Sequence, residues 1–300
     1  MKKSITDIDV LGKKCLVRVD FNVPLDAQKN VTDDTRLVGA LPTVKYLIEK
    51  GARVILASHL GRPKGVFNEE FSLAPVAAAF SKLLGKPIKM ATEIVGEKVK
   101  KMADELKNGE VMMLENTRFV KGEEANDDQL SKQLAQLCDV YVNDAFGTAH
   151  RAHASTAGVA KYVPVAVSGF LIAREIEIMG KALSAPQRPF VVVLGGAKVS
   201  DKIGVIKNLL NKADYILVGG GMAYTFFKAL GYNIGTSICE DEKVGLAKEL
   251  IAQAKEKKVN FMLPVDTVVA DKFSNDAHFT VMDSSGLPTD MMGMDIGPLT

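Results

Sequence analysis

Two kinds of segment alternate along the first half of the chain: short apolar runs rich in β-branched residues, and longer stretches with helical periodicity. The apolar runs at 15–21, 53–59, 110–116 and 139–146 show little polar alternation, which is typical of strands buried on both faces of a sheet. Strands that alternate with helices in this way predict an α/β fold with a parallel, doubly wound sheet.

The first helical stretch contains a proline inside its apolar stripe. That stripe is formed by Leu37, Leu41, Val44 and Ile48. Gly51 follows at the position where a left-handed residue commonly ends a helix. Pro42 interrupts the stripe, and because proline lacks the N–H of a helical hydrogen bond we expect the helix to restart near Leu41.

Two further helices are indicated by their end residues. The stretch 72–86 has Pro75 near its start and Gly85 near its end, the positions that these residues prefer. The stretch 126–137 begins with Asn126, whose side-chain oxygen is suited to cap the first backbone N–H groups of a helix. Both stretches therefore predict helices between strands.

The order of elements restarts in the second half. The stretch 169–183 has one apolar stripe and predicts a single amphipathic helix, followed by Pro186 and Pro189. A new series of strand-like runs then follows at 190–194, 214–220, 260–266 and 278–283. We therefore predict two Rossmann-like domains joined by a helix, with a first domain at 1–168, a connecting or hinge helix at 169–184 and a second domain at 185–300.

Composition describes an ordinary globular protein. Charged residues make up 25% and hydrophobic residues 47% of the 300 residues, and the net charge of +2 argues against a general nucleic-acid binder. The most apolar stretch, 163–173, is too short to span a bilayer, and the start has no apolar run long enough for a signal peptide. Three widely spaced cysteines predict buried free thiols in a reducing compartment. We expect a cytoplasmic protein.

Arginine follows the ends of the strands in the first half. Of the eight arginines in the chain, Arg36, Arg62, Arg118 and Arg151 stand after four successive strand-like runs. Ligands of open α/β sheets bind beyond the carboxyl ends of the strands, and guanidinium groups pair with carboxylate and phosphate. One such arginine is usually a solvated loop charge, but four at one topological position predict a site for a small polyanion.

Glycine follows the strand ends in the second half. Gly195 and Gly196 end one strand-like run, and three glycines at 219–221 end the next. Glycine lets backbone N–H groups approach a ligand, and the start of a helix favours anionic oxygens. Lys198 and Lys202 would share one face if the helix has begun by Lys198. A single Gly-Gly turn is usually only a tight loop, whereas two of them, one with paired lysines, are consistent with a site for nucleotide phosphates.

An arginine-lined site and a glycine-lined site in successive domains would suit phosphoryl transfer, in which catalysis is mainly positioning and charge neutralisation. Ser58 and His59 are adjacent on a strand and point to opposite faces, so they do not form a nucleophile–base pair. The lack of a general base fits a carboxylate acceptor, which is already ionised at neutral pH. A nicotinamide dehydrogenase has no support, because no G-x-G-x-x-G motif follows the first strand.

Long motifs then point to one family. RVDFNVPL (18–25), SHLGRPKG (58–65), LENTRF (114–119), NDAFGTAHRAHAST (143–156), LGGAKVSDKI (194–203), GGGMAYTF (219–226) and MGMDIGP (292–298) resemble phosphoglycerate kinase in order and spacing. The resemblance runs from about residue 4 to the last residue. It implies a cytoplasmic, monomeric glycolytic kinase that transfers a phosphoryl group reversibly between 1,3-bisphosphoglycerate and MgADP, giving 3-phosphoglycerate and MgATP, with hinge closure bringing the two sites together.

The resemblance also implies roles for matched residues. The 3-phosphoglycerate site would contain Asp20, Asn22, Arg36, His59, Arg62, Arg118 and Arg151. The nucleotide site would contain Gly195, Ala197, Lys198, Lys202, Gly221 and Gly293. Arg36, Lys198 and Lys202 would act directly on the transferring phosphates. His150 and His153 flank Arg151. Each is either a loop histidine with hydrogen bonds inside the protein or a ligand of the substrate, and the sequence leaves both interpretations open. His278 is expected to be structural.

The family pattern includes further motifs after the last one matched here, among them the aspartate that holds Mg²⁺. The resemblance therefore implies that the second domain is incomplete at its C-terminal end and that no metal-ligating residue lies within the 300 residues. Two functional hypotheses follow. The protein is an active phosphoglycerate kinase, or, if the chain ends at Thr300, it is a non-catalytic fragment that binds phosphate esters.

Overall fold

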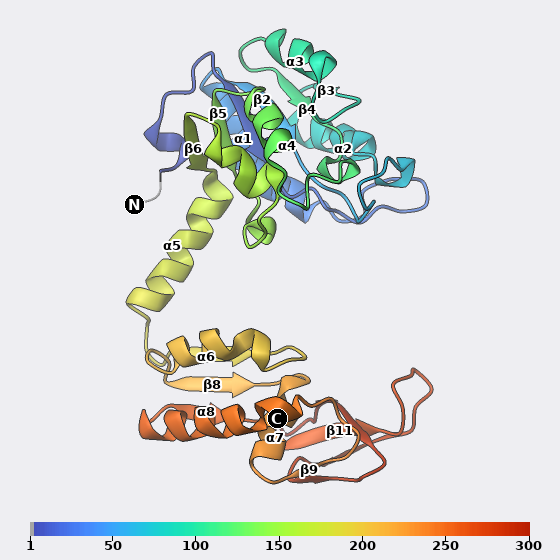
Figure 1. Cartoon of the computed structure of the whole chain (residues 1–300), viewed down its shortest axis with the longest axis vertical. Helices are drawn as coiled ribbons and strands as arrows, with labels where there is room; N and C mark the ends of the chain where they lie inside the picture. Colours follow the sequence, from blue (N-terminus) through green and yellow to red (C-terminus); the bar gives the residue numbers. More distant parts are fainter. Residues whose placement is uncertain (1–2) are drawn as a thin grey trace. The chain divides into compact units, whose positions relative to one another are not determined.

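The computed structural model describes residues 3–300, which form two compact units (Figure 1). The first unit ends at Met179 and the second runs from Gly180 to Thr300. No helix within residues 3–300 is long and apolar enough to cross a bilayer.

The first unit is built on one six-stranded sheet in the order β3-β4-β2-β1-β5-β6. Every neighbouring pair is parallel. Its strands are β1 (Lys14–Arg18), β2 (Arg53–Ala57), β3 (Ile88–Met90), β4 (Val111–Met113), β5 (Val140–Asn143) and β6 (Val165–Ser168). The four predicted strands are confirmed as β1, β2, β4 and β5, and their residues are almost all buried. β3 and β6 at the sheet edges were not predicted. Their residues are less buried; β3 is only three residues long, and β6 lies within the apolar stretch 163–173, which was not assigned to a strand.

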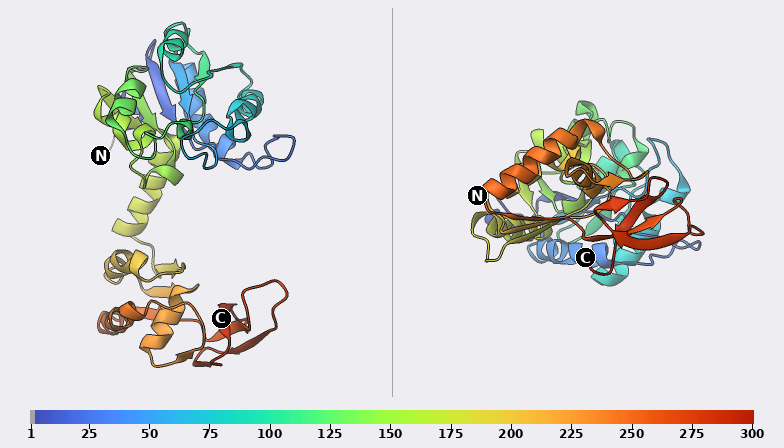
Figure 2. Two further views of the ribbon diagram at one scale, coloured as in Figure 1. Left: turned by 45° about the vertical axis from the view of Figure 1, so that its right-hand side comes forward. Right: turned by 90° about the horizontal axis from the view of Figure 1, so that it is seen from below.

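Helices cover both faces of this sheet, as Figure 2 also shows. One face packs on α1 (Thr35–Glu49) and α2 (Ala74–Leu84) through a core that includes Val17, Val44 and Phe80. The other face packs on α3 (Glu97–Asp104) and α4 (Asp128–Ala135) through a core that includes Leu16 and Leu134. Adjacent residues of β1 therefore belong to opposite cores, which is why the strand is apolar without alternation. The doubly wound arrangement is confirmed.

Some of the helix ends predicted from the sequence are observed in the structure. Gly51 and Gly85 both have positive φ after their helices, and Pro75 stands in the first turn of α2. The expectation of a restart near Leu41 is wrong, since α1 runs through Pro42 without a break. The missing N–H leaves the Val38 carbonyl without its helical donor, and Val38 lies on the exposed side of the helix where water can replace it.

The predicted N-cap of α4 is wrong by one residue. Asp127 is the cap, and its Oδ1 accepts a hydrogen bond of 2.8 Å from the backbone N–H of Leu130. Asn126 instead takes a left-handed conformation with φ of 55°, and its backbone N–H bonds to the carbonyl of Glu123. Both residues are good caps, so the local sequence did not distinguish them; the turn that leads into the helix did.

The predicted connecting helix is α5 (Phe170–Ser184). Asp144, which follows β5, caps its start: Oδ1 accepts hydrogen bonds from the backbone N–H groups of Leu171 at 2.9 Å and Ile172 at 3.3 Å. Ile172 is the one buried residue of α5, whereas Ile178 and Met179 are exposed. The boundary between the two compact units falls within this helix.

The second unit begins with a parallel three-stranded sheet in the order β10-β8-β7. Its elements are β7 (Val191–Leu194), α6 (Ile203–Leu209), β8 (Tyr215–Val218), α7 (Met222–Ala229), α8 (Val244–Glu256) and β10 (Asn260–Met262). One face of the sheet, with Leu194, Ile216 and Val218, packs in the core of the unit with residues of α6, α7 and α8. The parallel part of the second series is confirmed.

The later strands do not continue this series. The predicted run 260–266 is divided between β10 and β11 (Asp266–Ala270), and 278–283 corresponds to β12 (Phe279–Asp283). β11 pairs antiparallel with β12 and with β14 (Met292–Ile296). A parallel crossover needs a dozen or more residues, and only eight separate β11 from β12, so a hairpin is the connection that fits. β9 (Asn233–Ile234) and β13 (Gly286–Leu287) form a separate two-stranded parallel ladder.

Short helices complete the connections. They are η1 (Ile5–Asp7), η2 (Glu69–Phe71), η3 (Thr117–Phe119), η4 (Phe146–Thr148), the π-helical η5 (Ala154–Gly158), η6 (Val159–Lys161), η7 (Ser200–Lys202) and η8 (Asp241–Lys243). Cys15 and Cys138 are buried free thiols, as predicted, but Cys239 is half-buried.

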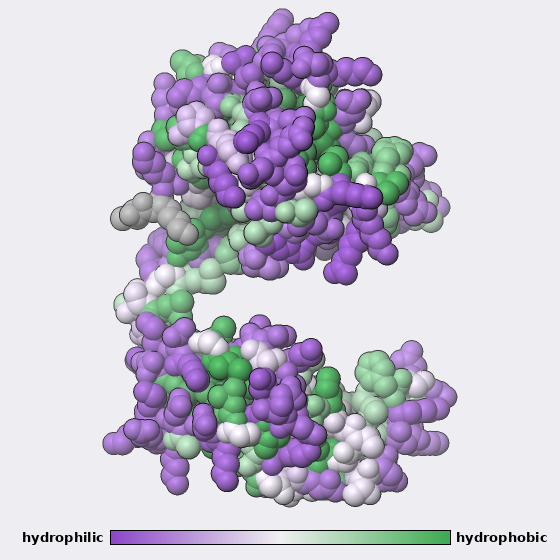
Figure 3. Space-filling view, in the orientation of Figure 1, coloured by the Kyte–Doolittle hydropathy of each residue, from purple (hydrophilic) through white to green (hydrophobic). Residues whose placement is uncertain are grey.

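The second face of the β10-β8-β7 sheet is exposed. The register places Val191 beside Tyr215 and Val193 beside Leu217, which is itself beside Met262. Val193 is 74% exposed and Met262 49%. Figure 3 shows apolar surface where β8 is labelled in Figure 1. One face of this sheet thus lacks a covering layer among the described residues.

Candidate active site

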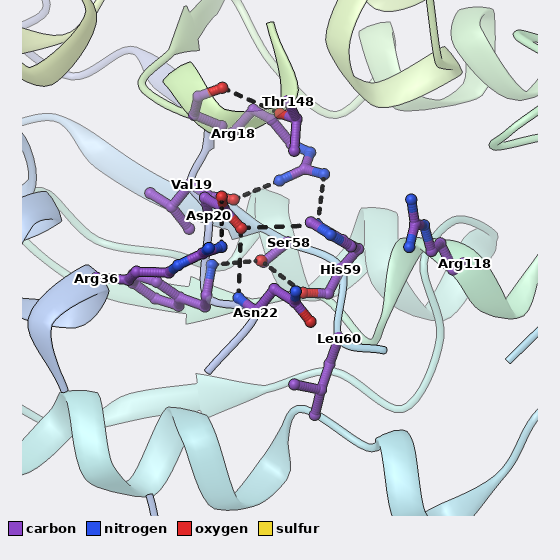
Figure 4. Close-up of polar contacts among 12 residues, drawn as sticks. Arg18, Val19, Asp20, Asn22, Arg36, Ser58, His59, Leu60, Arg118 and Thr148 are labelled. Atoms are coloured by element: carbon purple, nitrogen blue, oxygen red, sulfur yellow. Dashed lines mark hydrogen bonds and ion pairs between the residues drawn. The ribbon is translucent and has the colours of Figure 1, made fainter. Parts of the chain in front are cut away.

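The polar residues that follow β1, β2 and β4 meet at the carboxyl edge of the first sheet (Figure 4). Asp20 and Asn22 follow β1, His59 follows β2, and Arg118 lies in η3 after β4. The strands are parallel, so their carboxyl ends share one edge of the sheet. The fold therefore brings these residues of the predicted site together.

Arg36 is held by an acidic partner. Its Nη1 donates a hydrogen bond of 2.7 Å to Oδ2 of Asp20, which is largely buried, while the Arg36 side chain is half-exposed. Asn22 fixes the neighbouring loop, because its Oδ1 accepts a hydrogen bond of 2.8 Å from the backbone N–H of Gly61. A guanidinium has five N–H donors, and one bond to Asp20 orients the group while leaving donors for an anionic ligand.

Arg118 is nearly buried. Its Nη1 donates to the carbonyl oxygen of Gly61 at 2.8 Å. Its Nε lies 3.1 Å from Oε1 of Glu124, but the angles are not those of a hydrogen bond and this buried N–H has no hydrogen-bond partner among the described residues. Burial lowers the pKa of Arg118, yet a guanidinium stays charged in proteins. A buried, charged donor without a hydrogen bond is a strong candidate for contact with an anion.

His59 is a buried neutral ring. It is 4% exposed, and Arg18 Nη2 lies 3.1 Å from its Nδ1. Burial and the surrounding arginines, first of all Arg18, lower the pKa of His59 to about 2. The resemblance places His59 in the 3-phosphoglycerate site, and its lowered pKa leaves the ring without charge at neutral pH.

Arg62 and Arg151 lie on the loops around this edge. Arg62 is exposed, follows Gly61 directly and forms no hydrogen bond or ion pair within residues 3–300. Arg151 is half-buried, and its Nε donates to Nε2 of His150 at 3.2 Å. The charge of Arg151 acts on both His59 and Arg118, which places it within electrostatic reach of the site. His153 lies 3.9 Å from Glu123, and burial is the main cause that lowers its pKa.

In the second unit, the two glycine runs lie against each other. The backbone N–H of Gly219 donates to the carbonyl of Leu194, and that of Met222 donates to the carbonyl of Gly196, both at 2.8 Å. Gly220 has φ of +65°, and a Cβ there would lie 3.0 Å from the nitrogen of Gly196. The loops at 195–197 and 219–221 therefore pack closely at the carboxyl ends of β7 and β8, and glycine suits both the left-handed backbone and the short distance at position 220.

The predicted lysine pair is not helical. Lys198 precedes η7, Lys202 is the last residue of η7, and α6 begins at Ile203. The four-residue spacing therefore does not place them on one helix face. Lys198 is exposed and Lys202 partly buried, and Ala197 lies beside Gly221, where a Cβ would come within 3.3 Å of the Ala197 Cα.

Gly293 lies in β14 and has a packing role. A Cβ at this position would lie 2.3 Å from the ring of Tyr224, so no side chain fits unless the ring moves. Its backbone N–H donates to the hydroxyl of Ser237 at 2.8 Å. His278 precedes β12, and its backbone N–H donates to Oδ1 of Asp271 at 3.0 Å at the end of the β11–β12 hairpin. This is consistent with the structural reading of His278.

Comparison with known proteins identifies the family. The family model described as phosphoglycerate kinase matches residues 5–300. The chain belongs to the phosphoglycerate kinase family. Its structure is similar to that of phosphoglycerate kinase from Coxiella burnetii, with 44% identity and a TM-score of 0.81 over 100% of this chain and 75% of that one. It is also similar to phosphoglycerate kinase from Pyrococcus horikoshii OT3, with 32% identity and a TM-score of 0.76 over 99% of this chain and 76% of that one.

Family membership establishes the class of reaction. A phosphoglycerate kinase is a phosphotransferase of glycolysis that moves a phosphoryl group reversibly between 1,3-bisphosphoglycerate with ADP and 3-phosphoglycerate with ATP. Its acceptor in the ATP-consuming direction is a carboxylate, which is ionised at neutral pH and needs no general base. The predicted recognition, fold class and enzyme class are confirmed.

Sequence reasoning missed three buried residues of this chain. Arg18 is 1% exposed at the end of β1, and its Nε donates to the hydroxyl of Ser155 at 2.8 Å. That hydroxyl lies 2.5 Å from Oε1 of Glu123, which is completely buried. The arginine at the end of an apolar strand could have indicated buried partners, because a charged side chain is rarely buried unless it is paired. The partners are 105 and more residues away in sequence, so no local pattern points to them.

The described residues offer no protein-only metal centre. Within residues 3–300, no group of three or more histidine, cysteine, aspartate or glutamate side chains could hold a metal ion. The donors present at the two candidate sites are mainly guanidinium, lysine and backbone N–H groups, which bind anions and do not ligate cations.

Proposed function

We propose that the polar edge of the first sheet is the 3-phosphoglycerate site of this enzyme. Its residues are Asp20, Asn22, Arg36, His59, Arg62, Arg118 and Arg151. The observation that carries this assignment is the set of arginines at one sheet edge, among them the buried Arg118, whose Nε–H lies 3.1 Å from the Glu124 carboxylate without forming a hydrogen bond. A dianionic phosphate with a carboxylate supplies acceptor oxygens and negative charge for the remaining donors of this set.

Different residues at this edge bind the substrate and stabilise the transferring phosphoryl group. Arg118 and Arg62 bind substrate oxygens, and Asn22 fixes the loop that carries both Gly61 and Arg62. Arg36 is oriented by Asp20 from one side, so that its remaining donors neutralise the charge that develops on the transferring phosphoryl group. The acceptor carboxylate attacks directly, and the protein's contribution is position and electrostatics.

The nucleotide site is proposed at the paired glycine loops of the second unit. Gly195, Ala197 and Gly221 border the place where the two loops meet, and Gly195, where an added Cβ would have no atom within 4 Å, leaves room for close approach of phosphate. Lys198 and Lys202 supply cationic charge at the start of η7 and α6. Gly293 contributes by allowing Tyr224 to pack against β14.

The remaining properties follow from family resemblance. We propose that the nucleotide brings Mg²⁺ with it, that the protein acts as a cytoplasmic monomer, and that α5 connects a substrate domain to a nucleotide domain and acts as a hinge. The domain boundaries expected from the sequence, 1–168, 169–184 and 185–300, are the segments we propose for these roles.

Calorimetric titration with 3-phosphoglycerate tests the central assignment. Arg118→Ala should weaken binding roughly tenfold to a hundredfold, the loss expected for a hydrogen bond to a charged group. Arg53→Ala is the matched control, because Arg53 stands at the opposite, amino end of β2 and bonds the carbonyl of Gly12 at 3.0 Å. Equal affinities in wild type and Arg118→Ala, or equal losses in the two variants, would contradict the site.

A further inference from the structure

A chain of buried hydrogen bonds runs beneath the proposed substrate site. Glu123 accepts from Ser155 twice, from the backbone N–H at Oε2 (2.9 Å) and from the hydroxyl at Oε1 (2.5 Å). The hydroxyl of Ser155 in turn accepts from Arg18 Nε at 2.8 Å. All three side chains are at most 1% exposed. The single hydroxyl hydrogen is used by Glu123, so the lone pairs of the serine oxygen are directed to Arg18.

Arg18 connects this chain to His59. Its Nη1 donates to the carbonyl of Val19, and its Nη2 lies 3.1 Å from Nδ1 of His59, as Figure 4 shows. A guanidinium has no acceptor, so Nδ1 must be the acceptor and the proton of the neutral ring must be on Nε2. Nε2 forms no hydrogen bond to any residue in the described range 3–300.

The charges around His59 favour the neutral ring. Arg18, Arg36, Arg118 and Arg151 all oppose its protonation, together with burial. The carboxylate of Asp20 carries the opposite charge, but its Oδ1 lies 3.9 Å from Nδ1, too far for a hydrogen bond. The ring is therefore a neutral N–H donor among cationic neighbours.

We propose that Glu123 and Ser155 are positioning residues, which hold Arg18 in the orientation that fixes the Nε2–H tautomer of His59 and thereby present this N–H to an oxygen of 3-phosphoglycerate. The inference rests on the substrate site proposed above. A merely structural role, in which Glu123 compensates the buried charge of Arg18, would affect stability but would not fix the tautomer of His59.

The first test uses the protein without any substitution. Long-range ¹H–¹⁵N NMR of the histidine side chains reports which ring nitrogen carries the proton, and His59→Gln assigns the signals. At pH 7 we expect His59 to be neutral with its proton on Nε2. A proton on Nδ1, or a doubly protonated ring, would overturn the proposal without any positioning variant.

The second test removes the hydroxyl. In Ser155→Ala, we expect a mixture of His59 tautomers and an affinity for 3-phosphoglycerate about tenfold lower, as for a lost hydrogen bond to a charged group. Ser155→Thr keeps the hydroxyl and should restore both. Ser131→Ala is the matched control: Ser131 is a completely buried serine of α4 whose hydroxyl donates to the carbonyl of Asp127 at 2.7 Å. It should leave the tautomer and the affinity unchanged.

The outcomes separate the two proposals. Folded Ser155→Ala with the wild-type tautomer and wild-type affinity would overturn the positioning role. Wild-type protein with the Nε2–H tautomer but no binding of 3-phosphoglycerate would overturn the proposed substrate site, and with it the role of this N–H toward substrate. Binding of 3-phosphoglycerate with the proton on Nδ1 would overturn the positioning role alone.

Discussion

Gly220, in the loop that precedes α7, combines a left-handed backbone with close approach to a second backbone segment. Its φ of +65° is left-handed, and a Cβ would lie 3.0 Å from the nitrogen and 3.1 Å from the oxygen of Gly196. For an L-residue the left-handed conformation alone costs about 1–2 kcal/mol. The nearby atoms belong to backbone, which cannot rotate away as a side chain can. Gly220→Ala should therefore destabilise the second unit by at least that amount.

The expected shift can be measured by calorimetry. In a domain of 60–100 residues, a loss of 1 kcal/mol in the free energy of unfolding lowers Tm by about 4–8 °C, and in a larger domain the decrease is somewhat smaller. We therefore expect the unfolding transition of the second unit to shift down by several degrees. Because the substitution pushes the loop at 195–197 away from its hydrogen bonds, nucleotide affinity should fall as well. The transition of the first unit and its affinity for 3-phosphoglycerate should stay as in wild type.

Gly195→Ala is the matched control. Its φ is not in the left-handed region, and no atom lies within 4 Å of the Cβ that it would gain. It should leave Tm almost unchanged, while an added methyl group that blocks the approach of phosphate should reduce nucleotide affinity. A Gly220→Ala variant with wild-type Tm would refute the packing argument. A Gly195→Ala variant that binds nucleotide normally would show that phosphate does not approach this residue.

Three further predictions concern charge. In steady-state assays of an active enzyme, Arg36→Ala should lower turnover more than it lowers 3-phosphoglycerate binding, because the loss of this charge should raise the activation barrier by about 3–4 kcal/mol. Arg62→Ala should mainly raise KM. Unchanged kinetics in both variants would contradict these roles. Lys202→Ala should weaken nucleotide binding and leave 3-phosphoglycerate affinity unchanged in titrations, and equal losses of both would contradict separate sites. His59 stays neutral in the folded protein because its pKa is depressed to about 2, so below pH 6.5 the unfolded chain takes up a proton that the folded one does not. Stability should therefore decrease as pH falls from about 6.5, by at most about 1.4 kcal/mol per pH unit from this group, and His59→Gln should show a shallower decrease in denaturant titrations.

The sequence by itself determined the fold class and the main sites of chemistry in the first unit. Strands such as β1 and β2 are apolar on both faces because Leu16 and Val17 enter different cores, and only helices on both faces of a parallel sheet can bury them. Once the strands are parallel, the residues that follow them share one edge, so Asp20 and Arg118 could be placed near each other from their positions in the chain.

Tertiary structure decided the interactions that depend on distant or competing partners. Arg18 can be buried only because Ser155 and Glu123 reach it from segments more than 100 residues later, and no local pattern encodes that contact. The choice of Asp127 over Asn126 as a cap depends on the turn before α4. The direction of β12 depends on its pairing with β11, because a short apolar run has the same pattern in parallel and antiparallel sheets. Local sequence limits what each segment can form, and contacts between distant segments select among the forms that remain.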